Sequence, residues 1–465
     1  MNRPDEANRS HEALTRLVRQ ALTTDETSVP LHVKRKAGRV ISDSLACMIA
    51  AQAVPEVRRT HALHAISPSG AEATVFRSGR PRMDRPAAAF CNALAGVWAE
   101  LEEGYRPTAC HAGLYVLPAL LAEAEFRRLR TDTVLSLTAI AYEIVTRVAL
   151  AWEYPTLSDQ GRGWVHARYS AVGAAAATAL ARGSDLDTTL AAINGASTLV
   201  TVGPRRHAVD GALIWNAWPA VGVRNGMLAV DLAEAGIGGI PGALHDVYGV
   251  ELGGISHSHR LDVGFGAEWA ILDGYVKLHA CIQHAHSAVD AAIALGRRLS
   301  PSEREKIRVL MIETHPLGLF LQVRHPSTTL AAQFSLPHIV AASILLGHAE
   351  LAAFSPAAIA DSGISTLREA SQVIAFTDPC LPLHDRPSRV HVVLEDGRRI
   401  TETCLSAAGS PDNPLSEDQF TGKLSGLTHR DFPRFMDAVE ELGAGGHLCR
   451  SWPDVVSRIF AESDF

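Results

Sequence analysis

Apolar side chains recur at helical spacing through most of the chain up to about residue 265. In the segment 131–154 they fall at nearly every third or fourth position after a cap-like Thr131 and Asp132. The segment 170–182 consists largely of Ala and Gly and ends at Gly183, which is typical of a helix C-terminus and lets neighbouring helices approach closely. Similar patterns occupy residues 40–51, 117–130 and 221–235. This part of the chain is predicted to be a bundle of buried helices.

The pattern changes between residues 270 and 405. Residues 307–313 alternate and are rich in β-branched side chains, which predicts a strand. Residues 389–402 form two alternating runs joined at Asp396 and Gly397, a strong signal for a β-hairpin. Two helical segments accompany these strands: residues 287–299 precede the first strand, and residues 336–351 lie between it and the hairpin.

The tail returns to helical patterns at 416–424 and 431–442. The sequence therefore predicts a mainly α protein with two domains. Residues 1–268 and 406–465 form a large all-α helical domain, and residues 269–405 form a smaller α+β lid domain inserted into it.

Composition and charge narrow the class of protein. A chain of 465 residues with 47% hydrophobic and 20% charged residues is ordinary for a soluble globular protein. The net charge of −7 and the absence of a long basic block argue against a nucleic-acid partner. The seven cysteines are scattered and form no CxxC pair, so neither a disulfide framework nor a zinc knuckle is indicated. We expect a cytoplasmic protein with no membrane partner, since no secretion signal or uninterrupted membrane-length apolar stretch is present.

The densest group of chemically active residues lies in the segment 275–290, YVKLHACIQHAHSAVD. Ser287 and Asp290 have the spacing of a capping box, which predicts a helix that begins there. His284 and His286 would then lie just outside the helix N-terminus. The positive end of the helix dipole disfavours imidazolium, so both histidines are expected to stay neutral and usable as bases.

Lys277 would add a fixed positive charge to the same place. A carboxylate ligand is the natural partner for a lysine beside a helix N-terminus. This segment therefore predicts an anion pocket that contains a base.

Four stretches, in this order and spacing, make the chain resemble a known family: 92–118, 161–177, 275–291 and 332–347, with a further match at the turn 410–415. The family is the MmgE/PrpD (2-methylcitrate dehydratase) family, which also includes cis-aconitate decarboxylase and iminodisuccinate epimerase. The motif style is most similar to the epimerase branch. The resemblance implies a large all-α domain with an α+β lid, a homodimer, and cofactor-free chemistry on small polycarboxylates in the cleft between the domains.

The resemblance also implies catalytic residues. The family's Asp-Phe-Asp-Asp motif corresponds to the run Glu100 to Glu103, and His111 stands where the family has a catalytic histidine. Lys277 matches the lysine of the lid, and His286 matches a histidine of the epimerase branch. We therefore expect His111, Lys277, His286 and Glu100 to be catalytic.

Further positions are expected to contact the substrate: Glu103, Tyr105, Trp164, His166, Trp215, His284 and Phe320. A second family histidine is replaced near Trp164, and His166 takes the place of the next histidine of the epimerase branch. A lysine and a tyrosine of the decarboxylases are absent near Trp215 and Phe320. These replacements weaken the decarboxylase interpretation and predict a substrate with fewer carboxylates or with a sizeable apolar part.

Several polar residues also have simpler interpretations. His257 and His259 form an HxH pair, but no carboxylate or cysteine lies at ligand spacing, so a solvated loop is the better interpretation and no metal or cofactor is predicted. The glutamates of the run 100–103 could be an exposed acidic turn. Tyr142 and Arg147 lie on a helix with a core-facing stripe and are expected to be structural.

Three functions remain open on the sequence. The first is a lyase that removes a proton α to a carboxylate and expels water or another group. The second is an epimerase that reprotonates the same carbanion on its other face. The third is a non-catalytic homologue, suggested by Trp164, Trp215 and Phe320 at polar family positions. We rank the lyase first because lyases dominate the broader family, and we expect a small carboxylate as the substrate.

Overall fold

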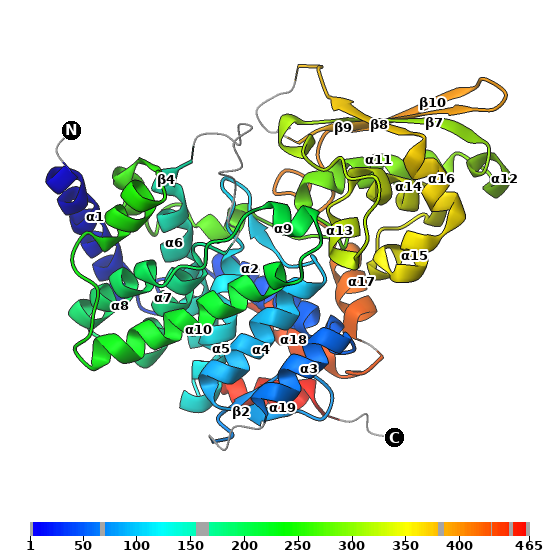
Figure 1. The fold of residues 1–465 in the computed structure, drawn as a ribbon. Helices are drawn as coiled ribbons and strands as arrows, with labels where there is room; N and C mark the ends of the chain where they lie inside the picture. Colours follow the sequence, from blue (N-terminus) through cyan, green and yellow to red (C-terminus); the bar gives the residue numbers. More distant parts are fainter. Residues whose placement is uncertain are drawn as a thin grey trace.

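The computed structural model describes residues 3–65, 70–154, 167–379, 386–428, 430–445 and 450–461. Most of these residues are helical, and a smaller α+β region lies at one end of the helical body (Figure 1). The predicted fold class is therefore confirmed. Trp164 and His166 lie outside the described residues.

The helical body is built around six long helices: α2 (Leu31–Ala50), α4 (Arg85–Trp98), α5 (Ala112–Arg127), α6 (Thr131–Leu150), α7 (Ser170–Arg182) and α10 (Ile214–Glu234). Helix α7 is almost entirely buried and packs directly against α10. A Cβ on Gly222 would lie 1.7 Å from Oγ of Ser170, and one on Gly226 would lie 2.3 Å from the carbonyl oxygen of Ala171. Small residues at this contact are what let the two helices approach so closely.

Further helices cover the body: α1 (Arg3–Thr23), α3 (Pro55–His64), α8 (Leu186–Thr198) and α9 (Arg206–Val209). The tail adds α17 (Glu417–Thr428), α18 (Phe435–Ala444) and α19 (Trp452–Ile459). In Figure 1 α18 and α19 lie against the body and α17 lies below the lid, and apolar residues of the tail share the body's hydrophobic core. A Cβ on Gly38 of α2 would lie 1.9 Å from the carbonyl oxygen of Leu442.

The lid contains a four-stranded sheet in the order β10-β9-β7-β8. Its strands are β7 (Ile307–Thr314), β8 (Ser371–Ala375), β9 (Ser388–Leu394) and β10 (Arg399–Cys404). Strands β7 and β8 are parallel, and the other pairs are antiparallel. The predicted hairpin is confirmed, with Gly397 at φ +83° in its turn.

Helices α11 (His286–Arg297) and α14 (Leu336–Leu346) pack against each other, and α11 lies along β9 and β10 (Figure 1). The remaining lid helices are α12 (Pro301–Arg304), α13 (Thr329–Gln333), α15 (Pro356–Ala360) and α16 (Ser362–Glu369).

The chain also has three two-stranded pairings: β1 (Ala73–Thr74) with β2 (Arg82–Met83), β3 (Gly104–Tyr105) with β6 (Gly274–Tyr275), and β4 (Trp152–Glu153) with β5 (Ile255–Ser256). The first and third lie within the body, whereas the second joins the body to the lid. The β3–β6 pair ties the end of the acidic run to the beginning of the segment that carries Lys277. The pairing is tight, because a Cβ on Gly104 would lie 2.2 Å from the hydroxyl oxygen of Tyr275.

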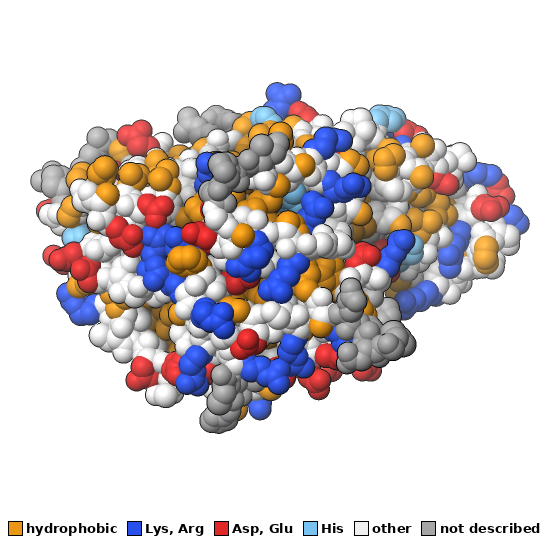
Figure 2. All heavy atoms as spheres, turned by 90° about the horizontal axis from the view of Figure 1, so that it is seen from below, with side chains coloured by type: hydrophobic (Ala, Val, Ile, Leu, Met, Phe, Trp, Pro, Cys, Tyr) orange, Lys and Arg blue, Asp and Glu red, His pale blue; other side chains and the backbone are white. Residues whose placement is uncertain are grey.

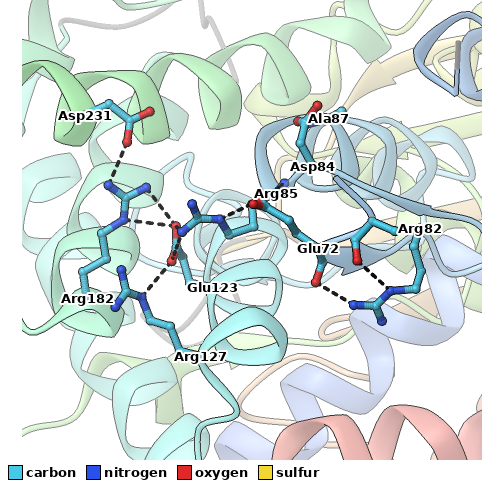
Figure 3. A network of polar contacts seen from close by, with 10 residues as sticks. Glu72, Arg82, Asp84, Arg85, Ala87, Glu123, Arg127, Arg182 and Asp231 are labelled. Atoms are coloured by element: carbon cyan, nitrogen blue, oxygen red, sulfur yellow. Dashed lines mark hydrogen bonds and ion pairs between the residues drawn. The ribbon is translucent and has the colours of Figure 1, made fainter. Parts of the chain in front are cut away.

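A buried charge network ties four of the body's helices together (Figure 3). Glu123 of α5 is fully buried and accepts hydrogen bonds from Arg85, Arg127 and Arg182, at donor–acceptor distances of 2.8–3.1 Å. Arg182 also binds Asp231 at the surface of α10. The network fixes the positions of the helices relative to one another, since a buried charge is tolerated only when it is paired.

Two further properties concern the surface. On the face shown in Figure 2, basic and acidic side chains of the described residues are interspersed. Among the described helices, α6 has the length and hydropathy of a membrane span, and α2 with α3 pass the same test as a pair bent by 97°. Helix α6 is packed inside the body, where Glu143 and Arg147 form an ion pair.

Candidate active site

A cavity with a free volume of about 70 Å³ lies where the body meets the lid. Several predicted residues line it together: Glu100, Tyr105, His111, Trp215, Lys277, His284 and Phe320. They come from segments that are far apart in the sequence. The β3–β6 pair brings the segment that contains Tyr105 next to the segment that contains Lys277. Glu103 and His286 do not line the cavity.

Glu100 is the first residue of the site along the chain, and its backbone conformation is strained. It follows the end of α4, is buried, and has a φ of +51°. A side chain other than glycine rarely adopts this left-handed region, and such strain is found preferentially at functional sites. The surrounding contacts hold the Glu100 carboxylate against Lys277, with 3.0 Å between Oε2 and Nζ.

Lys277 is 1% exposed and sits between two carboxylates of the body. Its Nζ donates to Oε2 of Glu100 at 3.0 Å and to Oε1 of Glu102 at 3.2 Å. Burial alone lowers the pKa of Lys277, but the negative charges of Glu100 and Glu102 outweigh it and hold the pKa above its ordinary value. Lys277 is therefore a cation rather than a base, and its first partners are carboxylates of the protein instead of the ligand expected from the sequence.

His111 occupies the N-cap of α5 and faces the same cavity. Its Nδ1 lies 3.0 Å from the carbonyl oxygen of Glu103 and 3.3 Å from Oε1 of Glu102. A carbonyl oxygen can only accept, so Nδ1 carries the proton and Nε2 is left with its lone pair. Burial and the charge of Lys277 lower the pKa of His111 to about 3, against the hydrogen bond to Glu103. His111 is thus a neutral imidazole with a fixed tautomer.

The expected capping box at Ser287 and Asp290 is wrong. Helix α11 begins at His286, its N-cap is Ala285, and no side chain caps it. The carboxylate of Asp290 instead accepts from the main-chain N–H of Ala408 at 2.8 Å, while its other oxygen pairs with a histidine earlier in the segment, His279.

His286 is consequently part of the first helical turn and is buried behind the cavity. It is 2% exposed, and its Nε2 lies 3.2 Å from the carbonyl oxygen of Cys281. The pKa of His286 is well below its ordinary value because of burial and the nearby positive groups. The structure does not bring this histidine to the cavity wall, so its expected role as a base is not supported by its position.

His284 reaches the cavity from the lid. Its pKa is lowered well below the ordinary value, first by burial and then by the charge of Arg386, with smaller effects from Arg106 and Arg205. Arg205 and Arg386 themselves line the cavity, and Arg106 lies near enough to His284 to affect its charge. This cationic end was not predicted, because the three arginines come from separate loops that show no common pattern in the sequence.

Arg205 is the most informative of the three. Its guanidinium carbon lies 4.2 Å from the centre of the Phe320 ring, and it lines the cavity. Burial lowers the pKa of Arg205, and among the described residues no carboxylate pairs with it. A stacked guanidinium without an acidic partner is suited to a planar carboxylate from a ligand.

Aromatic side chains form the neighbouring wall. The ring of Trp215 lies 5.1 Å from that of Trp218 and 5.7 Å from that of Phe334, measured between centroids. Trp215 and Phe320 thus line the cavity as expected. Arg205 and Arg386 line the same cavity, so the aromatic wall stands beside cationic groups.

Glu103 was expected to contact the substrate but lies outside the cavity. It is 1% exposed, and both of its carboxylate oxygens accept hydrogen bonds from the protein, from the N–H of Gly113 and the hydroxyl of Tyr142. Burial raises the pKa of Glu103 to about 7, although both hydrogen bonds oppose the shift.

The described residues contain no group of three or more His, Cys, Asp or Glu side chains placed to hold a metal ion. His257, the first residue of the HxH pair, lies with its Nε2 3.1 Å from a carboxylate oxygen of Glu153.

Comparison with known proteins agrees with this architecture. Residues 15–255 match the MmgE/PrpD N-terminal domain, and residues 279–442 match the MmgE/PrpD C-terminal domain. The chain therefore belongs to the MmgE/PrpD family, whose members include dehydratases and decarboxylases. A similar curated protein is the cis-aconitate decarboxylase-like protein oryM of Aspergillus oryzae, which is 24% identical over 423 residues, covering 85% of this chain and 86% of that protein.

Proposed function

We propose that this chain is a cofactor-independent lyase that removes a proton α to a carboxylate of a small carboxylic acid and then expels water. The observation that carries the proposal is the pairing of two groups on one cavity wall. The neutral His111 carries its proton on Nδ1 and none on Nε2, and Lys277 is held protonated beside it.

The two groups supply the two things that such a reaction needs. A carbon acid next to a carboxylate is weak, so a base must be accompanied by stabilisation of the developing enediolate. Nε2 of His111 takes the proton, and the ammonium of Lys277 lies where it can stabilise the added negative charge. The imidazolium that forms is stabilised in turn by Glu102, whose Oε1 is 3.3 Å from Nδ1.

A substrate would change the pKa of His111. A bound carboxylate adds negative charge beside Lys277, and this favours the protonated imidazole. Substrate binding therefore makes His111 a stronger base at the moment when it is needed.

The residues at the other end of the cavity indicate which class of substrate would bind. Arg205 and Arg386 favour a carboxylate there, whereas Trp215 and Phe334 favour an apolar group. We propose a hydroxy acid with two carboxylates and an apolar substituent. One carboxylate would bind at the arginines, and the other would lie beside Lys277.

A second function is favoured by one observation. His284 of the lid is a second neutral histidine on the same cavity. An epimerase of the iminodisuccinate epimerase type needs a second group to return the proton to the opposite face of the carbanion, and His284 could be that group.

Incubation in D2O with malate, 3-alkylmalates, 2-methylcitrate and cis-aconitate separates the possibilities. We expect a 3-alkylmalate to lose water, with no deuterium in the recovered substrate if elimination is irreversible. Deuterium in a recovered and epimerised substrate would instead establish the second function. Release of CO2 from cis-aconitate at a higher rate than any dehydration would contradict both.

A further inference from the structure

Glu103 supports His111 in two ways, one through a direct contact and one through the helix that follows it. Its main-chain carbonyl oxygen lies 3.0 Å from Nδ1 of the imidazole. Its carboxylate binds the N–H of Gly113, in the first turn of the helix whose N-cap is His111. One residue therefore holds both the ring of His111 and the backbone on which it is mounted.

The space around the Glu103 carboxylate permits little movement. A Cβ on Gly113 would lie 2.7 Å from Oε1, and a Cβ on Gly274 would lie 3.0 Å from the hydroxyl oxygen of Tyr142 and 3.4 Å from Oε2. Tyr142 donates to Oε2 at 3.0 Å. Nζ of Lys36 donates to the carbonyl oxygen of Gly274 at 2.9 Å, which ties the lid segment to the same cluster. Side chains and close-packed glycines thus fix the carboxylate from several directions.

We propose that Glu103 is a positioning residue that holds His111 in the Nδ1–H tautomer, with Nε2 aimed into the cavity. The inference rests on the proposed role of His111 as the base. If the α5 N-terminus shifts, the carbonyl of Glu103 no longer faces Nδ1. The ring can then carry its proton on Nε2, and in that tautomer it cannot accept a proton from the substrate at that nitrogen.

Hydrogen bonding, not charge, is the property that matters in this account. Glu103→Gln keeps an oxygen that can accept from Gly113, and the hydroxyl of Tyr142 can turn to accept from the new amide. Glu103→Leu has a similar volume but makes neither bond. The glutamine variant should therefore preserve the tautomer, and the leucine variant should lose it.

The matched control is Glu125→Leu. Glu125 lies on α5, the helix whose N-cap is His111. Like Glu103 it is buried, and it accepts from the N–H and the hydroxyl of Thr74, each at 2.7 Å. It lies far along α5 from His111, and it pairs with Arg82. This variant should be destabilised without any change at His111.

The experiment is a long-range ¹H–¹⁵N spectrum of the full chain labelled with ¹⁵N-histidine, with the His111 signals assigned by their loss in His111→Gln. The wild type, Glu103→Gln and Glu125→Leu should show His111 with a protonated Nδ1 and a bare Nε2 from pH 5 to pH 8. In Glu103→Leu, the Nε2–H tautomer should appear with a population of at least about one tenth. If the leucine variant does not fold, Tyr142→Phe should show the same change to a smaller extent.

Wild-type signals in Glu103→Leu, or in Tyr142→Phe where that variant is used, would overturn the positioning role. The spectrum needs no substrate. A protein that shows the expected tautomers but turns over none of the acids above would contradict the proposed function alone.

Discussion

Lys277, at the beginning of the lid, donates to a carboxylate oxygen of Glu100 at 3.0 Å, although Glu100 must adopt a φ of +51° to be there. The ion pair bridges the two parts of the chain that form the cavity. It also means that the lysine on which the proposed chemistry depends is held in place by the protein before any substrate arrives.

Replacing Lys277 by Met should affect both catalysis and stability. Two buried carboxylates lose their counter-ion, so we expect a loss of about 3 kcal/mol in the free energy of unfolding. Glu102 shares the lysine with Glu100, so both carboxylates are affected. Loss of the ammonium should also lower kcat/KM by about 100-fold or more.

Lys34→Met is the control for Lys277→Met. Lys34 pairs with Asp132 at 2.9 Å, and it does not line the cavity. Urea unfolding of both variants, together with kcat/KM, separates the two effects. Lys34→Met should lose stability but keep its activity, and equal losses of activity in the two variants would contradict the role of Lys277.

Arg205 should control substrate affinity. A hydrogen-bonded carboxylate–guanidinium contact contributes about 1.5–3 kcal/mol, so Arg205→Gln should raise KM by about 10- to 100-fold with little change in kcat. The neighbouring Arg206 is exposed and pairs with Asp210, which makes Arg206→Gln a matched control. Unchanged affinity for succinate in Arg205→Gln, measured by calorimetry against the control, would remove Arg205 from the site.

Glu103 should make stability depend on pH in a defined direction. Its pKa is about 7 in the folded chain and near 4.5 when unfolded, so the folded state binds more protons between these values. The free energy of unfolding therefore falls as pH rises from about 4.5 to about 7, by up to about 3 kcal/mol from this group. Glu103→Gln removes this titration. From about pH 4.5 to about pH 7 the wild type should therefore lose stability relative to the variant. A difference that is constant with pH would show that the Glu103 pKa is not raised.

The network around Glu123 should contribute to stability alone. Removing this fully buried carboxylate takes away the acidic group that Arg85, Arg127 and Arg182 share, and leaves Arg85 and Arg182 with partners nearer the surface, so Glu123→Ala should cost about 3–5 kcal/mol. Glu234 binds the same Arg182 from a more exposed position, so Glu234→Ala should cost less than about 1 kcal/mol. Thermal unfolding of the two variants gives the comparison, and similar losses would contradict the role assigned to burial.

The helices and the hairpin could be predicted because their signals are local. Gly183 and Gly397 adopt the positive φ angles that their positions suggested. The short strand β8 was missed, because its place in the sheet depends on parallel pairing with β7 and not on its own five residues.

Part of the site was accessible from the sequence, since His111 and Lys277 lie in dense, recognisable stretches. The cationic end was not, because Arg205 and Arg386 are isolated in their loops and are brought together only by the fold. His286 and Glu103 were misplaced for a related reason. Spacing cannot tell which side chain enters a cavity and which one faces the core behind it.

The most direct test of the central claim is the release of deuterium from a substrate labelled at the carbon α to its carboxylate, measured as HDO by ²H NMR. The comparison needs the wild type, His111→Gln and His286→Gln, since His286 is a nearby buried histidine that does not line the cavity. The account predicts release by the wild type and by His286→Gln, and a loss of at least about 100-fold in His111→Gln. Wild-type release by His111→Gln, or its loss in His286→Gln alone, would contradict it.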